Sequence, residues 1–120
     1  MLRPLLQAKI HRCTVTDADL NYIGSIAIDA ALLSATGIMP YQEVQVWNVT
    51  NGERFATYAI EAPADSGTIS VNGSAARRVH KGDLLIIAAF SLYSDADIAA
   101  GHHPKKIFVD ANNKMTAAPL

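Results

Sequence analysis

A Gly-Ser pair interrupts an apolar segment near the start of the chain, at Gly24 and Ser25. Glycine reaches backbone conformations that other residues avoid, so Gly24 could hold a strained shape that brings the Ser25 hydroxyl onto the Gly24 carbonyl carbon. A serine placed in this way is set up for nucleophilic attack on its own chain. The two residues taken alone favour a simpler interpretation, a bend or bulge, because glycine inside a strand commonly marks one.

A second group of reactive side chains lies on a predicted hairpin. Arg54 and Tyr58 stand on one face of the predicted strand at residues 54–60, with Thr57 on the opposite face. The guanidinium of Arg54 offers a rigid fork that suits a carboxylate, and the Tyr58 hydroxyl can donate a proton. The structural alternative is an exposed arginine whose stem packs beside an amphipathic tyrosine.

Searches for other chemistry give weak or negative results. The sequence holds no phosphate-binding loop, no dinucleotide fingerprint and no Gly-x-Ser-x-Gly elbow. His102 and His103 are adjacent and have no third ligand at a metal-site spacing, so no metal site is expected. Ser25, His11 and Asp19 supply the residue types of a hydrolase triad, a coincidence that a chain with four histidines makes easy.

The elements that must position these residues are short and separated by Gly, Pro, Asn and Asp. The pattern predicts a helix at residues 30–35, with Asp29 as its N-cap and Gly37 as its left-handed C-terminal residue. Asn51-Gly52 predicts a tight hairpin turn. The predicted strands lie at residues 5–16, 26–28, 44–49, 54–60, 68–71, 84–90 and 105–109, and helical turns are predicted at 74–78 and 94–100.

About six short strands with one or two short helices indicate a mainly-β fold, a small β-barrel rather than a parallel α/β sheet. In the first strand, strict alternation predicts Ile10 and Arg12 on one face and Cys13 on the other. Asp17-Ala18-Asp19 is expected to end that strand.

Length and composition indicate a single domain over residues 1–120, in which 50% of the residues are hydrophobic and 18% are charged. A net charge of −1 gives no basic surface for nucleic acid or for anionic lipid. No segment approaches the roughly 18 apolar residues of a membrane span. The single cysteine, Cys13, cannot form an internal disulfide, so we expect a cytoplasmic protein with no nucleic-acid or membrane partner.

Several segments, taken together, resemble the pyruvoyl-dependent aspartate alpha-decarboxylases. They follow the order and spacing of that family over about residues 2–90. The matching segments are LQAKIHR at 6–12, DLNYIGS at 19–25, WNVTNG at 47–52, RFATYAI at 54–60, ISVNG at 69–73 and Gly82-Asp83.

The resemblance implies a double-psi β-barrel, assembled as a homotetramer with active sites between neighbouring subunits. It also implies a proenzyme, in which the Ser25 hydroxyl attacks the Gly24 carbonyl and turns the amide into an ester. Beta-elimination then leaves a small chain, residues 1–24, and a large chain, residues 25–120, that begins with a pyruvoyl group. Thr57 would assist this processing step as a donor to the oxyanion.

The implied reaction is the decarboxylation of L-aspartate to β-alanine and CO2, through a Schiff base with the pyruvoyl group made from Ser25. This reaction feeds pantothenate and coenzyme A synthesis. Arg54 matches the family's substrate-carboxylate anchor, Lys9 a second cationic contact, and Tyr58 the proton donor to the decarboxylated carbon. The resemblance assigns the remaining substrate-binding positions to Thr57, Asn72, Gly73, Ser74 and Ala75.

Supporting roles near the cleavage point fall to Tyr22 and His11. Ser74 departs modestly from the family, in which alanine is common at this position. Two alternatives stay open at this point: a non-catalytic β-barrel that serves as a binding or oligomerisation module, and a serine hydrolase. A module would not need Ser25, and a hydrolase would keep an intact chain.

Overall fold

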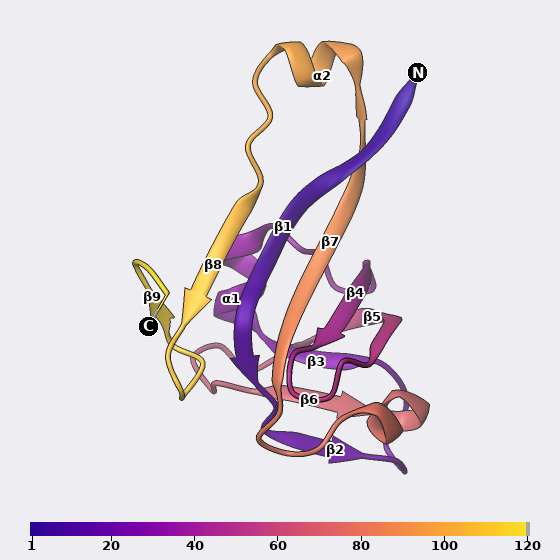
Figure 1. Cartoon of the computed structure of the whole chain (residues 1–120), viewed down its shortest axis with the longest axis vertical. Helices are drawn as coiled ribbons and strands as arrows, with labels where there is room; N and C mark the ends of the chain where they lie inside the picture. Colours follow the sequence, from indigo (N-terminus) through magenta and orange to yellow (C-terminus); the bar gives the residue numbers. More distant parts are fainter. Residues whose placement is uncertain (120) are drawn as a thin grey trace.

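The computed structural model of the chain describes residues 1–119 as nine strands, two short α-helices and one 3-10 helix (Figure 1). In chain order the elements are β1 (Leu2–Thr14), β2 (Asp17–Asp19), β3 (Ile26–Asp29), α1 (Ala30–Thr36), β4 (Glu43–Asn48), β5 (Arg54–Ala62), β6 (Ile69–Asn72), the 3-10 helix η1 (Gly73–Arg78), β7 (Leu84–Ser94), α2 (Asp95–Ala99), β8 (Lys105–Val109) and β9 (Met115–Thr116). The expectation of a mainly-β fold with one or two short α-helices is confirmed.

The strands are hydrogen-bonded in the order β2-β6-β3-β5-β4-β7-β1-β8-β9. Strand β3 lies between β5, to which it is parallel, and β6, to which it is antiparallel, so that Ile26 pairs with both Ala59 and Val71. This mixture of parallel and antiparallel neighbours is consistent with the double-psi β-barrel that the family resemblance implies. Because Ser25 directly precedes β3, the pairing fixes its position between β5 and β6.

Strand β1 contains a β-bulge that breaks the expected alternation. Ile10 pairs with Ile87 of β7, but the next core residue, Cys13, pairs with Leu85, so β1 carries one extra residue between these two pairs. Arg12 takes a φ of 62° at this point and is exposed, whereas Ile10 and Cys13 are both fully buried. The prediction that Ile10 and Cys13 lie on opposite faces is therefore wrong, because the bulge returns Cys13 to the core side.

The residues expected to terminate the first strand form a strand of their own. Asp17–Asp19 is β2, which pairs in parallel with β6 at the edge of the sheet. The expected helical turns do form, as η1 and as α2, and Ser94 caps α2 with a reciprocal capping box to Asp97. Within residues 1–119, no helix has the length and apolar character that crossing a bilayer requires.

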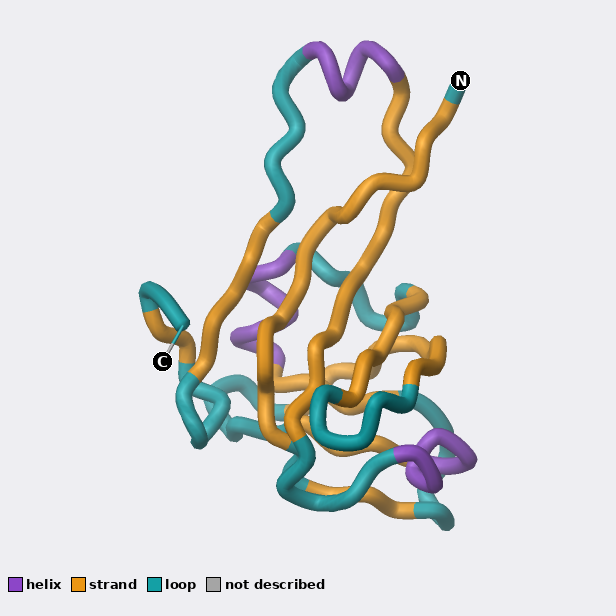
Figure 2. The backbone as a smooth tube through the Cα atoms, viewed as in Figure 1, coloured by secondary structure: helices purple, strands orange, loops and turns teal. Residues whose placement is uncertain are grey.

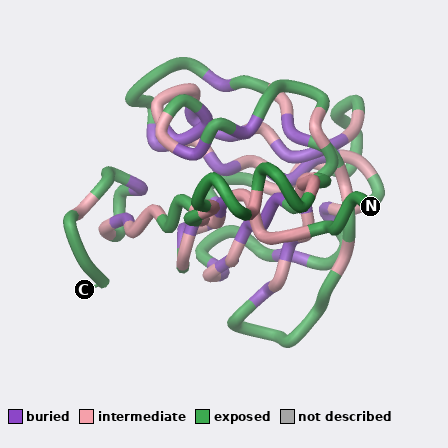
Figure 3. The backbone as a smooth tube through the Cα atoms, turned by 90° about the horizontal axis from the view of Figure 1, so that it is seen from above, coloured by how far each residue is buried: buried purple, intermediate pink, exposed green. Residues whose placement is uncertain are grey.

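The hydrophobic core is built from the central strands and α1. Seen from above, exposed stretches form most of the outline of the molecule and buried stretches lie mostly within it (Figure 3). The core's largest fully buried side chains are branched aliphatic residues, which suit the pleated surface of strands. They include Ile10, Ile26, Ile28, Leu32, Ile69, Leu85 and Ile87.

The outer ends of β1 and β7 project beyond this core as a two-stranded ribbon, next to the N-terminus and below α2 (Figures 1 and 2). The Nε2 atom of His102 lies 2.8 Å from the carbonyl oxygen of Leu6 and ties the segment after α2 to this ribbon. Leu2, Phe90 and Leu92 are exposed along the ribbon. We call these three residues the ribbon patch.

Asp29 fixes the end of β3 and the start of α1, as the sequence predicts. Its buried carboxylate accepts hydrogen bonds from the backbone N–H groups of Ala31 at 2.8 Å, Asp65 at 2.9 Å and Gly67 at 2.8 Å. At the other end of α1, Gly37 has a φ of 74°, the expected left-handed conformation. Asp29 thereby joins β3, which begins next to Ser25, to the loop before β6.

We expect Asp29→Ala to lower the free energy of unfolding by about 2–4 kcal/mol, because three backbone N–H groups lose their acceptor and the one from Gly67 is buried. The measurement is urea unfolding at pH 7. Ser94→Ala is the matched control, since it removes the N-cap of the exposed helix α2, and we expect it to cost about 1 kcal/mol or less. Equal losses for the two variants would contradict this role for Asp29.

The Asp29 carboxylate should also make the free energy of unfolding depend on pH in the acidic range. Burial opposes ionisation of Asp29, but the hydrogen bonds from Gly67, Ala31 and Asp65 outweigh it and lower the pKa below its ordinary value of 3.8. A group with a lowered folded-state pKa stabilises the fold above its unfolded pKa and loses that contribution as pH falls through the folded value. Unfolding curves of the natural chain and of Asp29→Ala should therefore converge below about pH 3.8.

Candidate functional site

The peptide between Gly24 and Ser25 lies in a strained bend. Gly24 has a φ of 46° and Ser25 a φ of 73°, so two consecutive residues occupy the left-handed region. Glycine adopts this region freely, but for serine it is uncommon and costs on the order of 1 kcal/mol. The backbone N–H of Asn72 donates a 2.9 Å hydrogen bond to the Ser25 carbonyl and holds the bend in place.

The Ser25 hydroxyl is buried and has no hydrogen-bond partner among residues 1–119. The residue as a whole is only 4% exposed. A buried hydroxyl without a partner costs stability, and such groups are uncommon in folded proteins. No competing hydrogen bond within the described chain therefore holds this oxygen away from the adjacent carbonyl.

Two residues close around Gly24. A Cβ atom placed on Gly24 would lie 2.8 Å from the hydroxyl oxygen of Tyr58, so only glycine leaves room for that hydroxyl. A Cβ atom on Gly73 would lie 3.3 Å from the Gly24 Cα and 3.5 Å from the carbonyl oxygen of Tyr22. Asn72, just before Gly73, is buried and accepts a 3.0 Å hydrogen bond from the Ser70 hydroxyl.

The structure therefore brings five of the predicted site residues together. They come from the start of β3, the middle of β5 and the end of β6: Gly24, Ser25, Tyr58, Asn72 and Gly73. Ser74 and Ala75 follow directly in η1, where Ser74 is exposed and Ala75 half-buried.

The β4–β5 hairpin presents Arg54 and Tyr58 on its exposed face, with Thr57 half-buried on the other, as expected. Trp47 stands directly opposite Arg54 in the hairpin, and the guanidinium carbon lies 4.4 Å from the centre of its ring. Sequence reasoning gave Trp47 no role, although a register counted from the Asn-Gly turn places the two residues opposite each other. The stacking restrains Arg54 while leaving its N–H groups free for a carboxylate.

Lys9 does not join this group within one chain. It is half-buried on β1, where its cross-strand neighbours are Ala88 and Lys106, and β5, β4 and β7 separate β1 from β3 in the strand order. Among residues 1–119, no hydrogen bond or ion pair joins Lys9 to Gly24 or Ser25.

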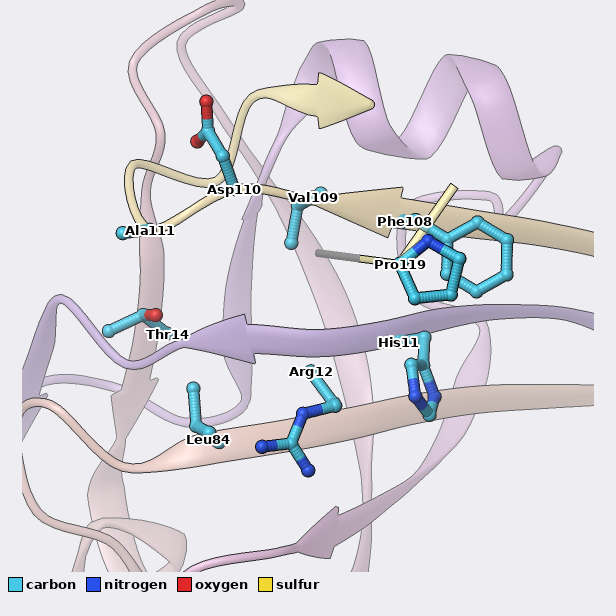
Figure 4. A pocket seen from close by; sticks show the side chains of 9 residues that line it. All are labelled: His11, Arg12, Thr14, Leu84, Phe108, Val109, Asp110, Ala111 and Pro119. Atoms are coloured by element: carbon cyan, nitrogen blue, oxygen red, sulfur yellow. The ribbon is translucent and has the colours of Figure 1, made fainter. Parts of the chain in front are cut away.

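His11 lies in a different hollow, of about 180 Å³, between β1 and β8 (Figure 4). Its ring meets Phe108 edge to face at 5.8 Å, and its Nδ1 atom is buried without a partner in the described chain. Burial, together with the positive charges of Lys9 and Arg12, lowers the pKa of His11, so the ring is neutral at pH 7. None of the residues gathered around Gly24 lines this hollow.

A second hollow, of about 280 Å³, borders the site beside Tyr22 and Asn72. Three carboxylates line it, from Asp17, Asp19 and Glu61, and no lysine or arginine does. Like charges repel, so this side of the site disfavours an anionic ligand. A ligand with carboxylates is better received near Arg54, at the start of β5, than near Glu61 toward its end.

Two further observations concern the cysteine thiol and the side chains that could bind a metal ion. Burial raises the pKa of the Cys13 thiol to about 12, which keeps it protonated and unreactive at neutral pH. In the part of the chain that the structure describes, no three His, Cys, Asp or Glu side chains gather closely enough to hold a metal ion.

Comparisons with known proteins identify the family. The family model described as aspartate decarboxylase matches residues 1–116. An aspartate 1-decarboxylase of Chromobacterium violaceum is 62% identical over 97% of this chain and 91% of its own length. Similar proteins with the same name occur in Burkholderia vietnamiensis, 51% identical over 96% of this chain and 90% of the relative, and in Albidiferax ferrireducens, 54% identical over 96% and 84%. The chain therefore belongs to the aspartate decarboxylase family.

Proposed function

We propose that this chain is a pyruvoyl-dependent aspartate 1-decarboxylase, which converts L-aspartate to β-alanine and CO2 in the route to pantothenate and coenzyme A. Family membership over residues 1–116 supports the reaction. The observation that supports the pyruvoyl chemistry is the strained Gly24-Ser25 peptide, with its buried hydroxyl that lacks a partner in the described chain.

The proposed maturation begins when the Ser25 oxygen attacks the Gly24 carbonyl carbon. The carbon–nitrogen bond of the peptide breaks, an ester bond forms, and the nitrogen of residue 25 becomes a free amine. Elimination then releases residues 1–24 as a carboxylate and leaves residue 25 as dehydroalanine, which takes up water and loses ammonia to give the pyruvoyl group. The left-handed bend favours the first step because breaking the peptide relieves its strain.

The surroundings of residue 25 fit a pyruvoyl group. The position is buried, its side chain has no hydrogen bond within the described residues, and the Tyr58 hydroxyl stands beside Gly24. When formed, the group supplies a carbonyl that joins the substrate amine and accepts the electrons released as CO2 leaves.

The chain's own residues would bind and orient the substrate around that position. Arg54, stacked on Trp47, would hold a substrate carboxylate through its guanidinium fork. Tyr58 would hold a proton for delivery to the carbon that loses CO2. The N–H of Asn72 would keep the carbonyl of residue 25 fixed, as it does in this structure. Thr57 would donate to the oxyanion during cleavage and contact the substrate.

The remaining predicted positions belong to the same proposal. The start of η1, with Gly73, Ser74 and Ala75, would form the pocket wall next to residue 25, because Gly73 already packs against Gly24. Lys9 would reach a site from a neighbouring subunit, since among residues 1–119 no hydrogen bond or ion pair joins it to Ser25. A reduced Cys13 and the biosynthetic reaction support a cytoplasmic location.

A homotetramer with active sites between subunits would also explain the ribbon patch. Register places Leu2, Phe90 and Leu92 on one face of the β1–β7 ribbon, where Leu92 is 62% exposed, with no core beneath it. Exposed apolar patches of this kind are typical of protein interfaces.

We expect Leu92→Glu to break the tetramer without unfolding the subunit, because it places a charge in an apolar interface. The measurement is molar mass by light scattering after size exclusion, and decarboxylation should fall with the tetramer. Met115→Glu, at an exposed apolar residue on β9, is the control and should leave the mass unchanged. A tetramer that survives Leu92→Glu would place the interface elsewhere.

The experiment that tests the proposed function is the intact mass of the purified protein after warm incubation, with and without hydroxylamine. We expect two fragments divided between residues 24 and 25, the larger of which reacts with hydroxylamine through its carbonyl. A protein that stays intact and nevertheless decarboxylates aspartate would refute the pyruvoyl mechanism. An intact chain without activity would favour a non-catalytic module.

A further inference from the structure

Tyr41 has an unusual backbone for its residue type. It precedes β4 with a φ of 72°, in the left-handed region that glycine and asparagine adopt more easily than tyrosine. The residue is 78% exposed, so burial in the core does not explain why a tyrosine stands here. Backbone strain at a residue with an exposed side chain suggests that the side chain has a function, which should be sought among its neighbours.

The loop that carries Tyr41 is held firmly against β5. The N–H of Tyr41 donates to the Ala59 carbonyl at 2.7 Å, and the N–H of Ala59 donates to the Gln42 carbonyl at 3.0 Å. The Gln42 amide donates at 2.7 Å to Gln7, which in turn donates at 3.1 Å to the Gly37 carbonyl. Tyr41 is thus locked beside Ala59, the residue that follows Tyr58.

The Tyr41 ring lies next to the Tyr58 ring, with centres 6.5 Å apart and planes inclined by 33°. Tyr58 is 40% exposed, and its hydroxyl makes no hydrogen bond within residues 1–119, although it stands beside Gly24. No hydrogen bond in the described chain therefore holds Tyr58 in this rotamer, and the Tyr41 ring lies where it can restrain the Tyr58 ring by packing.

We propose that Tyr41 is a positioning residue for the decarboxylation, whose ring keeps the Tyr58 hydroxyl at residue 24 and prevents it from turning toward solvent. This inference rests on the proposed role of Tyr58 as proton donor. The ring of Tyr41 performs the task, and its hydroxyl does not take part. The left-handed backbone is the conformation that directs the ring along β5.

The kinetic test compares Tyr41→Asn with Tyr41→Phe. Asparagine accepts the left-handed conformation, so Tyr41→Asn should keep or raise the melting temperature while it removes the ring. We expect kcat per pyruvoyl group to fall about tenfold with KM changed less than about twofold, because the donor is misplaced while substrate binding is intact. Tyr41→Phe should retain kcat. Met39→Asn, also exposed and in the same loop, is the control and should behave like the natural enzyme.

A double-mutant cycle links the effect to Tyr58. If Tyr41 acts through the Tyr58 hydroxyl, Tyr41→Asn should lower kcat in the natural background and have no further effect on top of Tyr58→Phe. Each variant is counted by its hydroxylamine-reactive carbonyl, so incomplete cleavage is not mistaken for slow chemistry.

A second measurement does not depend on activity. In the Ser25→Ala chain with ring-labelled tyrosine, the Tyr58 signal is assigned from its absence in a Tyr58→Phe spectrum. Tyr41→Asn should shift and sharpen that signal, whereas Tyr41→Phe and Met39→Asn should leave it in place.

The outcomes separate the two ideas. If Tyr58→Phe slows decarboxylation but Tyr41→Asn does not, the positioning role is wrong and the proposed function stands. If both variants are fully active, Tyr58 is not the proton donor and Tyr41 has nothing to position. Additive losses in the cycle, or an unchanged Tyr58 signal in Tyr41→Asn, would likewise overturn the inference.

Discussion

We expect a chain carrying Ser25→Ala to stay a single intact polypeptide and to have no detectable aspartate decarboxylase activity. The only atom removed is the buried oxygen, which in the proposed maturation both cuts the chain and leaves the reactive carbonyl behind. Without it neither step has a nucleophile, so the loss is complete rather than graded. Denaturing gel electrophoresis and intact mass measure cleavage of the chain, and CO2 release from L-aspartate measures activity.

The free energy of unfolding of Ser25→Ala distinguishes a structural role of Ser25 from a chemical one. The Ser25 hydroxyl has no partner among residues 1–119, so its removal should leave the free energy of unfolding unchanged, or raise it by about 1 kcal/mol, relative to the natural chain before cleavage. Ser34→Ala, at an exposed position of α1, is the matched control and should mature normally. Decarboxylase activity in the Ser25→Ala chain would refute the mechanism. An intact natural chain labelled at Ser25 by a serine-directed reagent would instead indicate a hydrolase.

The parts of the fold that the sequence predicts well are those governed by neighbouring residues. Asn51-Gly52 predicts the β4–β5 hairpin because its backbone preference acts over a few residues, and the strands pair as expected. The same holds for α1, whose Asp29 cap and Gly37 terminus act within one or two turns of helix. Such signals need no knowledge of the rest of the chain.

The parts that sequence missed depend on distant partners. The bulge at Arg12 arises where β1 must keep both Ile10 and Cys13 in the core against β7, and no local pattern marks it. No sequence pattern ties the C-terminal segment to the core, yet Asn113 is buried. Its side chain bonds Thr14 at 2.8 and 2.9 Å and the Gly67 carbonyl at 2.8 Å. An asparagine that joins three separate segments is indistinguishable in sequence from one in a loop.

The candidate site, like the fold, has features that the sequence predicts and features that depend on distant partners. Residue types alone favour an ordinary bend at Gly24-Ser25, and the family resemblance suggests the reactive role. The structure adds the physical grounds, a left-handed serine with an unpartnered hydroxyl. Tyr41 and Trp47 were missed because each matters only through a neighbour, Tyr58 or Arg54, that pairing brings to its side.

Replacing Arg54 by alanine should lower kcat/KM for L-aspartate by about 10²–10³-fold, mainly through a higher KM, while chain cleavage proceeds normally. The lost interaction is the charge-assisted, two-point hydrogen bond from the Arg54 guanidinium to a substrate carboxylate. No other residue on the exposed face of β5 can make this bond in its place. Cleavage is spared because it involves Gly24 and Ser25 before any substrate binds. Steady-state kinetics on fully cleaved protein provide the measurement.

Arg54→Lys separates charge from geometry in this binding role. Lysine keeps the positive charge but loses the planar fork and the guanidinium that lies 4.4 Å from the Trp47 ring, so we expect a defect between those of alanine and arginine. Trp47→Leu should produce a similar intermediate rise in KM, because it frees an arginine whose charge is intact. If KM were unchanged in Arg54→Ala, the substrate carboxylate would have to be held elsewhere, and Lys9 of a neighbouring subunit would be the cation to test next.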